Sequence, residues 1–99
     1  DADNGALEYV PGTQTWDSLP SVSFGGSRDQ LLEHLTPAQH SMFSPKLQPL
    51  KAGEALMHHA VTVHGSGPNA SGRPRRAVVL NYMSPSTRCK EGGELLAGA

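Results

Sequence analysis

Hydrophobic and polar positions first alternate over residues 6–10. An extended chain here places Leu7 and Tyr9 on one face and the even-numbered residues on the other. Asn4-Gly5 precedes the segment and Pro11-Gly12 follows it, and both pairs favour turns. The pattern therefore predicts a short strand from Ala6 to Val10 with a turn at each end.

The spacing of apolar residues becomes helical after residue 26. Ser27 and Gln30 fit a capping box, in which each side chain bonds the backbone N–H of the other residue. The leucines that follow fall on one side of this first helix: Leu31, Leu32 and Leu35. A second helix, through about Phe43, is predicted by its own N-terminal signal of Thr36, Pro37 and Gln39. The two helices form an insert that either covers a sheet or lids a pocket, and the sequence does not choose between these roles.

Three β segments are predicted in the second half of the chain. Residues 47–50 form a weak edge strand, because Pro49 cannot donate to a ladder. Residues 54–64 form a strong β segment. Residues 75–83 form the clearest strand, and apolar residues on both of its faces favour burial on both. With 11 glycines and 8 prolines, the chain is expected to have many turns and short strands, which indicates an all-β fold.

The composition narrows the range of partners. The formal net charge of −1 gives no support for a nucleic-acid or membrane-surface partner. No apolar run approaches the roughly 20 residues that span a bilayer, and no signal peptide is visible. Cys89 is the only cysteine, so no internal disulfide can form. We therefore expect a cytoplasmic protein, since a reducing compartment is compatible with this cysteine usage.

The residues best suited to chemistry lie between 64 and 75. His64 begins the sequence His-Gly-Ser-Gly-Pro-Asn, and Arg75 follows it by eleven residues, at the start of the predicted last strand. The loop between them is rich in turn-forming residues, so two neighbouring strands could aim both side chains into one cavity. An imidazole can bind a metal there, and a guanidinium can bind a carboxylate through two parallel hydrogen bonds. On spacing alone, however, His64 is more often a packed or surface residue, and Arg75 more often joins a surface ion pair.

These motifs resemble the phytanoyl-CoA dioxygenase family. The block from His64 to Asn69, the pair Arg75-Arg76 and the triplet Leu80-Asn81-Tyr82 look like its C-terminal half. Residues 4–13 are similar to its "NG-x-L-x-x-x-PG-S/T-H" segment, and residues 50–59 resemble a further strand of the family. Members are non-haem Fe(II)- and 2-oxoglutarate-dependent oxygenases on a double-stranded β-helix, or jelly roll. The resemblance implies that residues 1–99 are the C-terminal portion of a single such domain, with two short inserted helices.

The resemblance also implies roles for particular residues. His64 would be the second histidine of an iron-binding triad of two histidines and one carboxylate. Arg75 would bind the distal carboxylate of 2-oxoglutarate, with Arg73 and Arg76 as rival candidates. Ser66 is a plausible further contact to 2-oxoglutarate, although its hydroxyl could equally satisfy the turn. The enzyme would use dioxygen to hydroxylate a small organic substrate, with release of succinate and carbon dioxide.

Other polar residues and glycines near His64 are interpreted as structural. Asn69 is expected to stabilise the turn, and Gly65 and Gly67 are expected to allow backbone angles closed to other residues. Because adjacent strand residues point to opposite faces, only one member of the pair His58-His59 could share the cavity of His64. Both are interpreted as pocket-wall or packing residues.

The chain departs from the family pattern at two places. An H-x-D/E motif, which would supply the other two metal ligands, is absent from residues 1–99, and Gln14 stands where the family usually has a histidine. We interpret the sequence as a fragment of a larger oxygenase, inactive by itself, whose exposed strand edges favour self-association. Two alternatives stay open: a halogenase of the same family, and a non-enzymatic β-helix domain that binds a carboxylate ligand or a protein.

Overall fold

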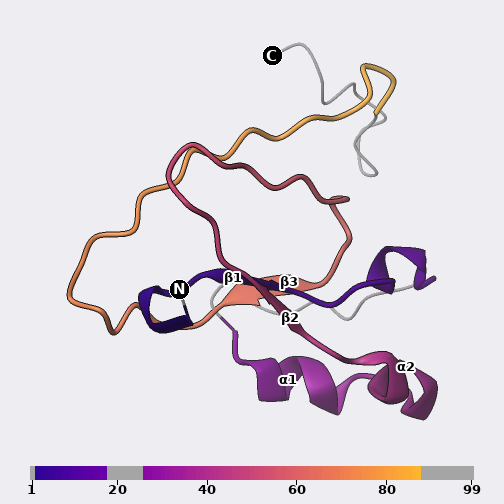
Figure 1. The fold of residues 1–99 in the computed structure, drawn as a ribbon. Helices are drawn as coiled ribbons and strands as arrows, with labels where there is room; N and C mark the ends of the chain where they lie inside the picture. Colours follow the sequence, from indigo (N-terminus) through magenta and orange to yellow (C-terminus); the bar gives the residue numbers. More distant parts are fainter. Residues whose placement is uncertain (1, 18–25, 88–99) are drawn as a thin grey trace.

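The computed structural model describes residues 2–17 and 26–87 (Figure 1). These residues form the strands β1 (Leu7–Tyr9), β2 (Lys46–Gln48) and β3 (His64–Ser66), the helices α1 (Arg28–Glu33) and α2 (Pro37–Met42), and the 3-10 helices η1 (Ala2–Asn4) and η2 (Thr13–Thr15). Within them, no helix is long and apolar enough to cross a membrane. The described part is a small sheet with two helices, and the complete double-stranded β-helix stays a prediction.

The strands form one antiparallel sheet in the order β2-β1-β3. The strand predicted between Ala6 and Val10 is confirmed as the central strand β1. Its Tyr9 lies opposite His64 of β3, and its Leu7 lies opposite Ser66. Pairing of β1 with β3 therefore joins the segment 4–13 directly to the block that begins at His64.

Both predicted helices are confirmed together with their caps. The Ser27 hydroxyl accepts from the Gln30 N–H at 3.3 Å, and the Gln30 side chain accepts from the Ser27 N–H at 3.1 Å. Thr36 and Gln39 make the same reciprocal bonds at 3.2 and 2.9 Å. Helix α2 ends at Met42, with Phe43 as its C-cap. Each box satisfies N–H groups that a helix start would otherwise leave without a partner, so two six-residue helices begin where the sequence indicates.

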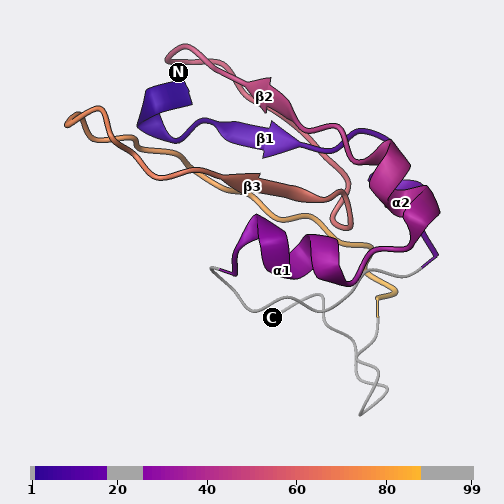
Figure 2. The ribbon, with the colours of Figure 1, turned by 90° about the horizontal axis from the view of Figure 1, so that it is seen from below.

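The helices lie on one side of the sheet, and segments 49–63 and 74–87 arch over the other side (Figures 1 and 2). The side chain of Glu8 faces the helices, because it forms an ion pair with Arg28 of α1. The buried apolar side chains of the described residues are Ala6, Val10 and Leu35. Leu7 and Tyr9 therefore face the opposite side, as the alternation predicts. The helical insert covers the sheet and does not lid the side on which Tyr9 lies.

Two of the three later strand predictions are wrong. Only His64 of the predicted segment 54–64 lies in a strand, and the Thr62 N–H instead closes a turn on the His59 carbonyl at 3.0 Å. No strand forms over residues 67–87, where Val78 and Tyr82 are 88% and 82% exposed. The physical reason is pairing, since a strand needs a neighbour's N–H and carbonyl groups, and the only ladders among the described residues are those of β1 with β2 and with β3. The predicted edge strand is confirmed as β2, which ends at Gln48, before Pro49.

Glycine conformational freedom is used at Gly5 and not where the sequence predicted it. The described glycines with positive φ are Gly5, Gly12, Gly53 and Gly72. Gly65 and Gly67 are not among them, so the prediction for those two is wrong. Gly5 has a φ of 77°, and a Cβ there would lie 2.8 Å from the carbonyl oxygen of Gly67. The Ala70 N–H also donates to the Asp3 carbonyl at 2.7 Å. The turn before β1 therefore packs tightly against the block that follows His64.

We expect Gly5→Ala to destabilise the protein by more than Gly72→Ala does. Both glycines have positive φ, at 77° and 70°, which costs an alanine about 1–2 kcal/mol. Only at Gly5 would the new Cβ also collide with backbone, because nothing lies within 4 Å of the corresponding position at Gly72. Urea unfolding of the two variants measures the difference. Equal losses of stability would show that the close approach to Gly67 does not exist in solution.

Candidate metal and cosubstrate site

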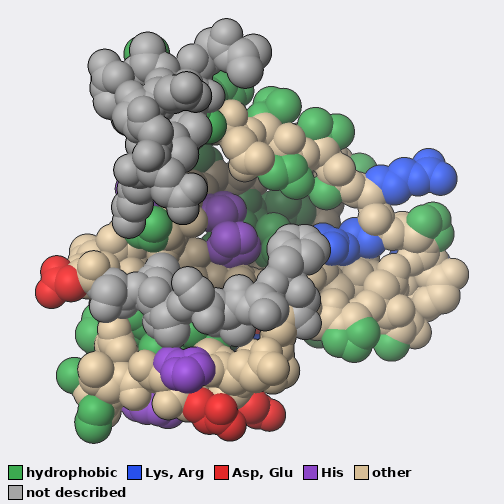
Figure 3. Space-filling model, turned by 180° about the vertical axis from the view of Figure 1, so that it is seen from behind, with side chains coloured by type: hydrophobic (Ala, Val, Ile, Leu, Met, Phe, Trp, Pro, Cys, Tyr) green, Lys and Arg blue, Asp and Glu red, His purple; other side chains and the backbone are tan. Residues whose placement is uncertain are grey.

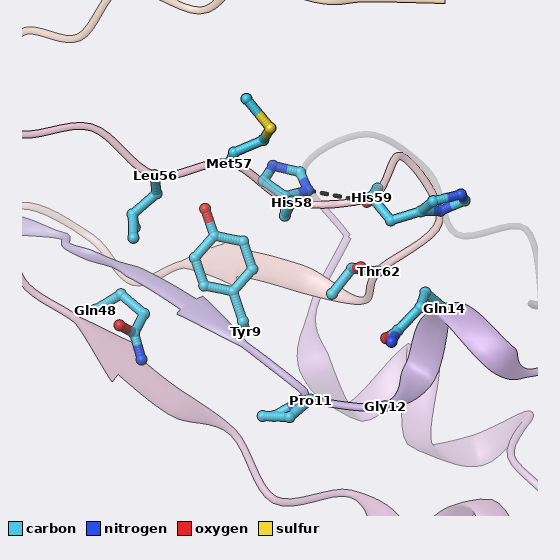
Figure 4. A pocket seen from close by; sticks show the side chains of 10 residues that line it. All are labelled: Tyr9, Pro11, Gly12, Gln14, Gln48, Leu56, Met57, His58, His59 and Thr62. Atoms are coloured by element: carbon cyan, nitrogen blue, oxygen red, sulfur yellow. Dashed lines mark hydrogen bonds between the residues drawn. The ribbon is translucent and has the colours of Figure 1, made fainter.

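His64 is the first residue of β3, and it belongs to a cluster of three rings. Its ring centroid lies 4.4 Å from that of His58, with an interplanar angle of 48°, and 6.0 Å from that of Tyr9. The Tyr9 and His58 centroids are 5.0 Å apart. Tyr9 reaches the cluster from β1, and His58 reaches it from the segment that arches over the sheet (Figure 4). Strand pairing and the arch together restrict the position of the His64 imidazole.

The hydrogen bonding of the His64 ring leaves its Nε2 available to a metal. Its Nδ1 lies 2.7 Å from the carbonyl oxygen of Thr62. Because a carbonyl oxygen can only accept, Nδ1 carries the proton, and the lone pair of the neutral ring is on Nε2. Metal-binding histidines in proteins are commonly fixed in this way, with one ring nitrogen donating to a carbonyl and the other bound to the metal. His64 therefore suits the role of a metal ligand.

The two preceding histidines differ from each other. Nδ1 of His58 lies 3.0 Å from the His59 carbonyl oxygen and must donate, as in His64. Nδ1 of His59 instead accepts from the Val61 N–H at 3.3 Å. Figure 4 shows the His58 ring beside Tyr9 and the His59 ring turned away from both. Of the two, His58 is the one whose ring lies against that of His64.

Next to these rings the surface is hollowed. An open hollow of about 400 Å³ borders Tyr9 and His58, and Figure 3 shows histidine and hydrophobic side chains meeting in a hollow of this face. Its lining residues are Tyr9, Pro11, Gly12, Gln14, Gln48, Leu56, Met57, His58, His59 and Thr62. This confirms His58 and His59 as pocket-wall residues. Among the described residues, the lining includes no lysine, arginine, aspartate or glutamate, so this part of the hollow suits a molecule without strong charge.

Ser66 and Arg75, the predicted cosubstrate contacts, lie in different settings. Ser66 is on the same face of β3 as His64, since the two residues are two positions apart and lie opposite Leu7 and Tyr9. Within the described residues its hydroxyl makes no hydrogen bond, so the turn does not use it. Arg75 is exposed and lies in a segment without regular structure. Within the described residues, no hydrogen bond or ion pair connects Arg75 to β3. Its approach to His64 therefore stays a prediction.

Asn69 stabilises the turn, as the sequence predicts. Its side-chain carbonyl accepts from the Ser71 N–H at 3.1 Å and from the Ser71 hydroxyl at 2.7 Å. Its amide donates to the Arg73 carbonyl at 2.7 Å. These bonds organise the chain between His64 and Arg75 without leaving Asn69 for a ligand.

The described residues do not contain a complete set of metal ligands. No group of three or more histidine, cysteine, aspartate or glutamate side chains in ranges 2–17 and 26–87 could hold a metal ion. Cys89 lies outside these ranges. The remaining ligands of a triad are therefore still expected in an H-x-D/E motif.

A model of a known protein family matches most of the chain. The family model for phytanoyl-CoA dioxygenase matches residues 1–77, which include β1, the block at His64, and Arg75, but not the triplet Leu80-Asn81-Tyr82. No curated protein and no solved structure gives a significant match. The family in general comprises oxygenases that depend on Fe(II) and 2-oxoglutarate. Because the match covers more than half of its residues, this chain belongs to the phytanoyl-CoA dioxygenase family.

Proposed function

We propose that this chain supplies a metal-binding histidine and the cosubstrate anchor of an Fe(II)/2-oxoglutarate-dependent oxygenase that hydroxylates a small organic molecule. The proposal depends mainly on the position and hydrogen bonding of His64. The residue lies within the family match, its Nδ1 is bonded to the Thr62 carbonyl, and its ring adjoins two residues that line the hollow. This is the arrangement that a histidine ligand needs.

Each of the three proposed site residues has a distinct task. His64 would hold iron through Nε2, and Arg75 would bind the distal carboxylate of 2-oxoglutarate with its planar guanidinium. The Ser66 hydroxyl, on the same face as His64, would donate a further hydrogen bond to this cosubstrate. When bound, iron and 2-oxoglutarate supply the activation of dioxygen, with release of succinate and carbon dioxide.

The chain prepares His64 for this task before any ligand arrives. The bond from Nδ1 to Thr62 fixes the tautomer, and pairing of Tyr9 with His64 fixes the backbone. The neighbouring Tyr9 and His58 rings limit rotation of the imidazole. A ligand held in its bound orientation loses less conformational entropy when the metal binds.

The hollow favours a neutral substrate. Its lining combines apolar groups from Leu56 and Met57 with amides from Gln14 and Gln48. Apolar walls with a few polar groups are usual in small-molecule sites, where the polar groups fix orientation. We therefore propose a small, uncharged substrate that has both apolar surface and hydrogen-bonding groups.

Release of succinate tests the proposed function. The full-length protein, incubated aerobically with Fe(II) and 2-oxoglutarate, should form succinate, and the same mixture without iron or without dioxygen should not. Iron binding without succinate release would favour the non-enzymatic alternative. Transfer of chloride to a substrate would favour the halogenase. Failure to bind both iron and 2-oxoglutarate would refute the proposal.

A further inference from the structure

Thr13 has the only fully buried side chain among the described residues, with an exposed fraction of 0%. It lies at the start of η2, directly after Pro11-Gly12. Its hydroxyl donates to the Val10 carbonyl at 2.8 Å and accepts from the Val63 N–H at 2.8 Å. The hydroxyl therefore uses both kinds of hydrogen bond to tie the end of β1 to a residue fifty positions later.

Val63 immediately precedes His64, and it is held from two directions. Its N–H donates to Thr13, and its carbonyl accepts from the Val10 N–H at 2.9 Å. The β1–β3 ladder continues from there, with Tyr9 opposite His64. The backbone that leads into His64 is thus fixed by the turn that follows β1.

The bond to Thr13 also acts on the His64 ring. The Val63 N–H and the Thr62 carbonyl belong to one peptide unit, which is planar. The N–H of this unit donates to the Thr13 hydroxyl, and its carbonyl accepts from Nδ1 of His64. A single rigid group therefore connects the Thr13 hydroxyl to the imidazole, and its rotation would misalign both bonds.

From this connection we infer that Thr13 is a positioning residue, which sets the tautomer and orientation of His64 through the peptide unit between Thr62 and Val63. The inference rests on the proposed function for its consequence, which is metal binding. The link itself rests on the hydrogen bonds alone. It gives the threonine of the Pro-Gly-Thr sequence a part in the site, although Thr13 does not line the hollow.

Thr13→Val and Thr13→Ser test the inference. Valine keeps the shape and loses the hydroxyl, so Fe(II) binding to the full-length protein should weaken roughly 10-fold or more, as is usual when a partner that orients a metal-binding histidine is lost. Serine keeps the hydroxyl and should bind Fe(II) like the wild type. The matched control is Thr15→Val, because the Thr15 hydroxyl donates to the Gly12 carbonyl at 2.7 Å, a bond that stays within the turn after β1. Anaerobic titration gives the affinities.

A second measurement separates this inference from the proposed function. In the metal-free protein, 15N NMR of the His64 ring reports its tautomer, and Thr13→Val should move it away from the Nδ1–H form. The inference is overturned if the His64 tautomer does not change in Thr13→Val. It is also overturned if Thr13→Val binds iron like the wild type while His64→Ala binds none. If only the tautomer shifts and His64→Ala binds iron normally, the link stands and the proposed function fails.

The wild-type protein supplies the test if Thr13→Val does not fold. The Val63 amide should then be protected from hydrogen exchange, and its proton should show a nuclear Overhauser effect to the Thr13 hydroxyl proton. A Val63 amide that exchanges as fast as an exposed one would overturn the inference.

Discussion

Replacing His64 with alanine should weaken Fe(II) binding to the full-length protein by at least about 100-fold. Loss of residues that merely orient a metal-binding histidine typically costs 10- to 100-fold in affinity, so loss of the ligand itself should reach at least the upper end of that range. The stability of the fold should change little, by about 0.5 kcal/mol, because the side chain is exposed. Anaerobic titration with Fe(II), together with urea unfolding of the metal-free protein, measures both quantities.

His40→Ala is the matched control. It removes an exposed imidazole from α2, across the sheet from the ring cluster, and should leave iron affinity unchanged. If His64→Ala and His40→Ala both bind iron as tightly as the wild type, His64 is not a ligand and the proposed function fails. A parallel loss in both variants would indicate binding at dispersed histidines.

Features determined by nearby residues were predictable from the sequence. Both capping boxes depend on side chains three residues from the groups they bond, as Ser27 and Gln30 show. The strand β1 lies between turn sequences, and its alternation correctly assigned Glu8 to one face and Tyr9 to the other. Such signals are complete within a few residues, so tertiary context had little opportunity to override them.

Features that need a distant partner were not predictable. Residues 54–63 and 75–83 contain good strand formers, but a strand exists only where a neighbour offers its N–H and carbonyl groups. Periodicity shows which residues share a face and does not identify the neighbour. The close approach of the Gly67 carbonyl to Gly5 has the same origin, because it brings together two distant parts of the chain.

The candidate site also combines features that the sequence indicated with features that it did not. His64 was singled out from its motif, and alternation along an assumed strand allowed only one member of the pair His58-His59 to lie beside it. The structure brings the two rings together, although His58 lies in a turn-rich segment and not in a strand. The hydrogen bond between Thr13 and Val63 was not foreseen, since only the fold brings these two distant residues together. The signal available in the sequence was the occurrence of Pro-Gly-Thr and His-Gly-Ser in blocks that both resemble one family.

Replacing Arg75 with alanine should weaken 2-oxoglutarate binding roughly 10- to 100-fold and leave Fe(II) affinity unchanged. A net loss equivalent to one charge-assisted hydrogen bond, about 1.5–3 kcal/mol, would have this effect, since about 1.4 kcal/mol corresponds to a tenfold change in affinity. Iron affinity should not respond, because an arginine is not a metal ligand. Anaerobic titration of the iron-loaded, full-length protein with 2-oxoglutarate, after a separate iron titration, distinguishes the two effects.

Two further variants show whether geometry or charge matters at this position. Arg75→Lys keeps the charge but loses the planar fork, so its 2-oxoglutarate affinity should fall between those of the wild type and Arg75→Ala. Arg76→Ala removes the same charge from the adjacent exposed residue and should have a small effect, since water and salt screen exposed charges. A larger loss in Arg76→Ala than in Arg75→Ala would transfer the anchor to Arg76. Equal loss of iron and 2-oxoglutarate binding in Arg75→Ala would mean that the arginine supports the fold of the site and does not contact the cosubstrate.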